Sequence, residues 1–130
     1  MEIRFLGHAS FEIIEGSARV LIDPFLAPDN PAAVVGPEEV EPTHILLTHG
    51  HGDHVTHAVE VAKRTGAKCV ALVELARWLS DQGVDDVADP NLGGTVELEW
   101  GWVKLVPAFH TNTLPDGQVI GLSAGLVIGI

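Results

Sequence analysis

Cysteine is almost absent from this chain. Cys69 is the only one in 130 residues, so the chain cannot form an internal disulfide. A lone thiol is typical of proteins that fold in a reducing compartment, and we expect a cytoplasmic location. Cys69 lies in the apolar run 68–73, which predicts a buried core thiol rather than a nucleophile or a metal ligand.

Basic residues are also scarce. Seven Lys and Arg side chains stand against 18 Asp and Glu side chains, which gives a formal net charge of −11. A surface of this sign repels phosphate backbones, so we expect no nucleic-acid partner.

Long hydrophobic runs are missing. The segment 119–130 is apolar but short for a membrane span and is interrupted by Gly121, Gly125 and Gly129. It predicts a buried strand, and we expect no membrane partner. The N-terminus has no basic segment followed by an apolar one, which predicts no signal peptide.

Strand and helix patterns alternate along the chain, without repeats. The chain has 130 residues, of which 46% are hydrophobic, and this is enough for one domain with its own core. We therefore expect residues 1–130 to belong to a single domain. A helix is expected after Asp53, which can cap it, and before Gly66. The pattern favours an α/β fold. The remaining expected elements are strands at 3–6, 10–15, 19–22, 44–48 and 68–73, a loop at 23–42, a helix at 74–82 and a hairpin of 95–99 with 102–106.

The densest chemical signal is the segment His49-Gly50-His51-Gly52-Asp53-His54. Three imidazoles and a carboxylate in six residues suit a divalent cation such as Zn²⁺. If the preceding strand continues, His49 and His51 point the same way and can share one ion. Glycines beside them leave room for an ion and a substrate. Chance clustering on an exposed loop is the alternative.

This segment matches the HxHxDH signature of the metallo-β-lactamase superfamily. Three flanking segments extend the resemblance to UlaG-like metal-dependent hydrolases, whose best-known type is L-ascorbate-6-phosphate lactonase. They are Leu6-Gly7-His8-Ala9-Ser10-Phe11, Leu21-Ile22-Asp23-Pro24-Phe25 and Pro107-Ala108-Phe109-His110. The resemblance implies an αββα sandwich, of which this chain supplies roughly the N-terminal half. Family members continue further and supply an Asp that bridges two metals and a last His, so we expect the domain to be truncated at its C-terminus.

The resemblance also implies roles for individual residues. His49, His51 and His110 would hold a first ion, with an open position for water. Asp53 and His54 would begin a second site, and Asp53 would also orient or deprotonate the attacking water. Asp23 would accept the distal N–H of a ligand histidine from behind, unless it merely starts the loop before Pro24. His8 could approach from a turn and support the ligands in the same way. Thr111, Asn112 and Thr113 could hydrogen-bond a substrate.

The function implied is metal-assisted hydrolysis of a small ester, lactone or phosphoester, with Zn²⁺ or Mn²⁺ and up to two ions. The apolar strand 119–130 would lack its usual neighbours, so we expect a homo-oligomer. Two alternatives stay open. One is an incomplete fragment that holds metal without catalysis, and the other is a nuclease of the same superfamily, which the charge disfavours.

Overall fold

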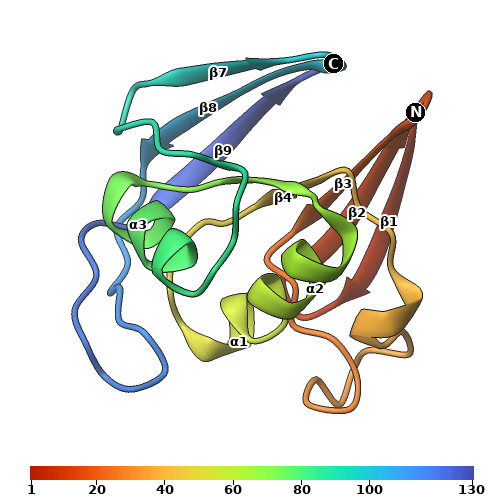
Figure 1. Ribbon diagram of the computed structural model, residues 1–130, viewed down its shortest axis with the longest axis horizontal. Coiled ribbons are helices and arrows are strands. Elements are labelled where there is room, and N and C mark those ends of the chain that lie inside the picture. The colour runs from red at the N-terminus through yellow and green to blue at the C-terminus, as the bar shows by residue number, and fades with distance from the viewer.

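The computed structural model describes residues 1–130 as two β-sheets flanked by helices (Figure 1). None of the helices has the length and apolar content that a membrane crossing requires. The strands are β1 (Glu2–Gly7), β2 (Ser10–Glu15), β3 (Ala18–Ile22), β4 (His44–Leu46), β5 (Lys68–Val70), β6 (Val87–Ala88), β7 (Thr95–Leu98), β8 (Gly101–Pro107) and β9 (Ala124–Gly129). The helices are the 3₁₀-helix η1 (Pro37–Glu39), α1 (Gly52–Val55), α2 (Ala58–Thr65) and α3 (Val73–Asp81).

The larger sheet has six strands in sequence order, β1 to β6. β1, β2 and β3 are antiparallel, whereas β3 to β6 are parallel. Parallel strands need crossover connections, and α2 and α3 supply two of them. The carboxyl ends of β3 and β4 consequently lie side by side, and the loops that leave them can meet at one edge of the sheet.

The smaller sheet has three antiparallel strands, β7, β8 and β9. It covers one face of the larger sheet, while the helices cover the other (Figure 1). Because side chains alternate along a strand, Leu21 and Ile45 pack in the cluster on the helical side, whereas Val20 and Leu46 pack with Val103 of the small sheet. The molecule therefore has three layers, helices, sheet and sheet, and the α/β prediction is confirmed.

The helix expected after Asp53 is divided in two. The first piece ends at Val55 and the second begins at Ala58. Between them, the backbone N–H of His57 donates to Pro24 O at 3.1 Å instead of to a carbonyl of its own helix. His51, not Asp53, is the N-cap residue of α1, so the predicted capping role of Asp53 is wrong. Gly66 ends α2 in the left-handed conformation, as predicted.

Two strands are shorter than expected. β4 ends at Leu46, which pairs with Ile22, the last residue of β3. At the next residue, Asp23, a φ of 44° turns the chain away from the sheet, so β4 loses its partner on this side. Thr48 N then donates to the Asp23 side chain instead of to a neighbouring strand, at 2.8 Å from Oδ1. β5 likewise ends at Val70.

The C-terminal segment is only partly the buried strand that its composition predicts. β9 begins at Ala124, and Val119 and Leu122 before it are exposed. Its inward side chains, Leu126 and Ile128, pack against the core between the sheets. The core-thiol prediction is confirmed, because Cys69 is fully buried and burial raises its pKa to about 12.

Candidate metal centre

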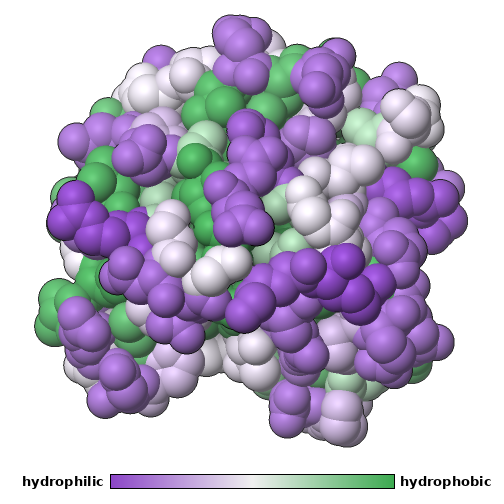
Figure 2. Space-filling model, in the orientation of Figure 1, coloured by the Kyte–Doolittle hydropathy of each residue, from purple (hydrophilic) through white to green (hydrophobic).

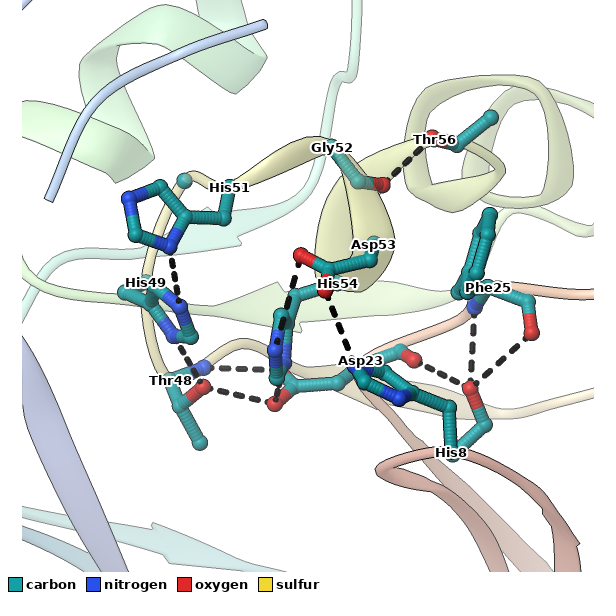
Figure 3. A network of polar contacts seen from close by, with 12 residues as sticks. His8, Asp23, Phe25, Thr48, His49, His51, Gly52, Asp53, His54 and Thr56 are labelled. Carbon is teal, nitrogen blue, oxygen red and sulfur yellow. Dashed lines mark hydrogen bonds and ion pairs between the residues drawn. The ribbon is translucent and has the colours of Figure 1, made fainter. Parts of the chain in front are cut away.

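Five separate segments bring the predicted site residues to the carboxyl ends of β3 and β4. Asp23 follows β3, His49 and His51 follow β4, and Asp53 and His54 lie in α1. His8 occupies the turn between β1 and β2, and His110 follows β8 of the small sheet. Figure 3 shows most of these side chains pointing toward one another.

His49, His51 and His110 form one group. Their ligand atoms all lie within 4.8 Å of one another. The ring centre of His49 is 4.6 Å from the ring centre of His51 and 4.7 Å from the ring centre of His110. His49 Nε2 lies 3.1 Å from His51 Nδ1, so these two nitrogens face a common position. The convergence expected for a strand is reached instead in the loop after β4.

A hydrogen-bond relay fixes the ring of His49. Thr48 Oγ1 lies 2.6 Å from Asp23 Oδ2 and 2.8 Å from His49 Nδ1. A carboxylate only accepts, so the single hydroxyl proton of Thr48 goes to Asp23, and Nδ1–H of His49 donates to Thr48. This tautomer, inferred from the hydrogen bonds, leaves the lone pair of His49 Nε2 free toward His51. Thr48 is a site residue that motif reasoning missed, although it directly precedes the first histidine.

The buried ring of His49 stays neutral. Its side chain is nearly inaccessible, and burial, followed by the nearby His54, His51 and His110, lowers the pKa of His49 to about 4. Metal ligation requires a deprotonated ring nitrogen, so at neutral pH His49 is in the form that binds an ion.

His8, Asp53 and His54 form a second group of ligand atoms within 4.8 Å of one another. His8 Nε2 lies 2.9 Å from Asp53 Oδ2, and His54 Nε2 lies 3.8 Å from Asp53 Oδ1. The two groups are adjacent, because the ring centres of His49 and His54 are 4.1 Å apart. Donors for two ions therefore stand next to each other.

The charges of this second group oppose the effect of burial. Burial by itself lowers the pKa of His54, but the hydrogen bond to Asp23 and the charges of Asp23 and Asp53 outweigh it and raise the pKa. For Asp53, burial raises the pKa, but the charges of His54 and His8 have the opposite effect, and the pKa is lowered overall. Asp53 is thus a carboxylate at neutral pH.

Asp23 lies beneath the rings of His49 and His54, in contact with Thr48 and His54. It is 2% exposed, and its Oδ2 is 2.8 Å from His54 Nδ1. A proton held on Nδ1 leaves His54 Nε2 free on the side of Asp53. The same carboxylate accepts from Thr48 and so supports both His49 and His54.

Asn112 does not face a substrate as expected. It is buried, its Oδ1 accepts from Gly50 N at 2.7 Å, and its Nδ2 donates to Ile120 O and Leu122 O. All its hydrogen-bonding groups are used to join the loop after β8 to the loop after β4. Sequence gives no sign of this, since the partners are 62 residues apart. Thr111 does lie at the site, with Oγ1 3.5 Å from His51 Nε2.

Two further histidines belong to the scaffold rather than to these groups. His57 Nδ1 accepts from Leu26 N, and its Nε2 pairs with Asp29. His44 lies at the opposite end of β4, where a surface cavity of about 450 Å³ is lined by polar residues that include Lys68 and Asp86. Neither residue approaches the two ligand groups.

The donor set fits a divalent metal. Three imidazoles with one ring fixed as a neutral tautomer match the ligands that zinc takes in catalytic sites, and an adjacent carboxylate–imidazole pair can serve a second ion. A three-layer α/β fold with such a centre at the carboxyl ends of its parallel strands defines a class of metal-dependent proteins.

Comparison with known proteins identifies that class. The sequence model of the metallo-beta-lactamase superfamily matches residues 3–126, and the chain belongs to this superfamily. It is 46% identical over 131 residues to a UPF0173 metal-dependent hydrolase of Methanopyrus kandleri, and 50% identical over 129 residues to one of Archaeoglobus fulgidus. These matches cover 98% and 99% of this chain but 56% and 54% of the relatives, so the chain spans about half their length.

Among solved structures, the chain is similar to Igni18, a metallo hydrolase from Ignicoccus hospitalis. The TM-score is 0.84 at 27% sequence identity, over 98% of this chain and 55% of that one. The fold seen here is therefore that of the superfamily.

Proposed function

We propose that this chain carries the metal centre of a UlaG-like metal-dependent hydrolase. The observation that carries the proposal is the convergence of His49, His51 and His110, from two different sheets, with their ligand atoms within 4.8 Å. Relatives at 46% and 50% identity are named metal-dependent hydrolases, which supports the same assignment here.

Zn²⁺ is the preferred ion, and Mn²⁺ is the alternative. Imidazole donors suit zinc, whereas the carboxylate of Asp53 suits either ion. When bound, such an ion lowers the pKa of its water from about 15.7 to about 7 and polarises the oxygen that gains charge.

The chain's own residues would prepare the reaction. Asp23 and Thr48 hold His49 and His54 in the tautomers that leave Nε2 free. Asp53, ionised and about half exposed, could accept a proton from the attacking water. His110 and Thr111 lie on the exposed side, where a substrate would arrive.

The substrate we propose is a small ester, lactone or phosphoester. A net charge of −11 disfavours polyanions such as nucleic acids. We also propose a cytoplasmic, homo-oligomeric protein. The single buried cysteine supports a reducing compartment, and exposed apolar side chains at Ile3, Phe5, Val127 and Ile130 support assembly.

The experiment that tests the proposal measures metal first and turnover second. The chain is dialysed against Zn²⁺ or Mn²⁺, its metal content is determined, and lactones, carboxylic esters and phosphodiesters are then offered. Firm metal binding with hydrolysis supports the proposal. Firm binding without hydrolysis of any of them would favour the non-catalytic alternative, and no firm binding would contradict a metal centre.

A further inference from the structure

We infer that Asn112 is a positioning residue of the proposed metal centre, and that Ser123 assists it. Their side chains hold the loop that carries His110 against the loop that carries His49 and His51, so that the three rings converge before an ion binds. This inference rests on the proposed function, because it explains how that centre is assembled.

His110 lies in the loop that joins β8 to β9, residues 108–123. This β8–β9 loop runs back beside the chain that follows β4 (Figure 1). His110 itself is exposed, so burial of its own ring does not fix its place. Its position beside the rings of His49 and His51 therefore depends on how the loop is held.

The side chain of Asn112 joins the two loops directly. It is 6% exposed, and its Oδ1 accepts from Gly50 N at 2.7 Å, between the first two histidines of the group. Its Nδ2 donates to Ile120 O at 3.1 Å and to Leu122 O at 2.8 Å, which closes the β8–β9 loop on itself. A Cβ at Gly50 would lie 3.2 Å from Asn112 Oδ1 and 2.9 Å from Ile120, so the two loops approach closely enough to require glycine.

A second set of hydrogen bonds holds the same junction. Thr48 O accepts from Ala124 N at 2.9 Å, so the backbone is bonded across to the β8–β9 segment on both sides of His49, at Thr48 and at Gly50. Ser123 is 3% exposed, and its Oγ lies 3.1 Å from His110 O and from the carbonyl oxygen of the next residue. The backbones that carry the three rings are thus fixed to one another by groups that are not ligand atoms.

Packing alone does not set the path of this loop. Leu114 and Ile120 anchor it in the buried cluster on the helical side, whereas Val119 and Leu122 are exposed. On the face seen in Figure 2, hydrophobic residues likewise lie at the surface among hydrophilic ones. Burial of apolar surface is non-directional, so it keeps the loop on the core without orienting the third histidine. Hydrogen bonds are directional, and the two buried polar side chains of the loop supply that orientation.

The first measurement is the affinity for Zn²⁺. Ligands that are already in place cost little further ordering when an ion binds. Without the Asn112 side chain the ion itself must order the loop, and affinity falls. We expect Asn112→Ala to lower the Zn²⁺ affinity about 10–100-fold, the range for residues that hold ligands in place. Competition with a chelator measures the change, and an unchanged affinity would overturn the inference.

A double-mutant cycle shows whether Asn112 acts through His110. In a chain that already carries His110→Ala, the loop has no ring to position, so Asn112→Ala should cause little further loss of affinity. A residue that only stabilises the fold would lower the affinity equally in both backgrounds. Equal losses in the two backgrounds would therefore contradict the positioning role.

Asn30→Ala is the matched control. Asn30 is 2% exposed, and its side chain also bonds to backbone, donating to Phe25 O and accepting from Ala32 N. These partners carry none of the three rings. Asn30→Ala should lower the free energy of unfolding of the metal-free chain but keep the Zn²⁺ affinity of wild type. If it lost as much affinity as Asn112→Ala, the loss of any buried amide would explain the effect and the inference would fail.

Two further measurements decide the inference if Asn112→Ala does not fold. Ser123→Ala removes only a hydroxyl, and it should show the same pattern in the cycle with a smaller loss; no loss would count against the clamp. In the metal-free wild type, NMR should show Overhauser contacts from the ring of His110 to those of His49 and His51, whose centres lie 4.7 and 5.1 Å away. Their absence would overturn the inference. A wild-type chain that holds no ion firmly would contradict the proposed function, while the ring contacts would still decide whether the rings are positioned in advance.

Discussion

His44 begins β4 and His49 lies in the loop that follows this strand, yet the two histidines are alike in several respects. Each is 6% exposed, and burial lowers the pKa of each ring. Their surroundings differ. His44 accepts a hydrogen bond from Trp100 Nε1 at 3.2 Å, whereas His49 lies beside His51, His54 and His110. Burial and a neutral ring therefore do not identify a metal ligand. The convergence of several donors on one position does.

The largest effect that would test this comparison is the loss of the first ion. His51→Ala deletes a donor, so we expect metal affinity to fall by more than about 100-fold and turnover to fall with it. His44→Gln should keep the metal content of wild type. Elemental analysis after dialysis measures both variants. If His44→Gln loses the metal to the same extent, general stability rather than convergence would determine binding.

Asp53→Asn separates chemistry from metal binding at the first site. The substitution keeps the size of the side chain and removes its charge, so the three-histidine ion should remain. We expect turnover to fall by about 10²–10⁴-fold, the range for loss of a positioned general base. Steady-state rates on whichever ester, lactone or phosphoester the parent accepts provide the measurement. Near-normal turnover would show that Asp53 does not handle the proton.

Asp23→Asn tests the support behind the rings. Asn tolerates the positive φ of Asp23, but an amide NH₂ in place of Oδ2 would face the Nδ1–H of His54. We expect metal affinity to fall about 10–100-fold while the metal-free fold persists. Competition with a chelator measures the change. Unchanged affinity would mean that Asp23 only stabilises the loop after β3.

The smallest effect concerns His44 and pH. Because its pKa in the folded chain is lowered from 6.5, the unfolded chain takes up more protons below that pH, and folding stability falls as the pH falls. His44→Gln should weaken this dependence, at a cost of about 1 kcal/mol at pH 8 for the lost hydrogen bond to Trp100. Urea unfolding of the metal-free chain at pH 8 and pH 5.5 gives the comparison. An equal pH dependence in both proteins would contradict the assigned environment.

Local patterns in the sequence predicted most of the elements, and the resemblance pointed to the distant His110, whose ring lies beside those of His49 and His51. Other features depend on contacts that no local pattern records. The break between α1 and α2 follows from a bond between His57 and Pro24, and the buried role of Asn112 follows from bonds to a loop far away in sequence. The placement of His8 depends on a left-handed residue in a turn, and local propensity would have favoured glycine there.

The position of His110 has a mechanical consequence. His51 follows a strand of the larger sheet, and His110 follows a strand of the smaller sheet. The two histidines are far apart in the chain, since Thr111, the neighbour of His110, is 60 residues from His51. An ion bound to both would close this loop as a disulfide would, in a chain whose single cysteine cannot do so. By mass action, an ion at 100 times its dissociation constant would add about 2.7 kcal/mol to the free energy of unfolding. This metal cross-link between the two sheets would be reversible, because a chelator that removes the ion would break it.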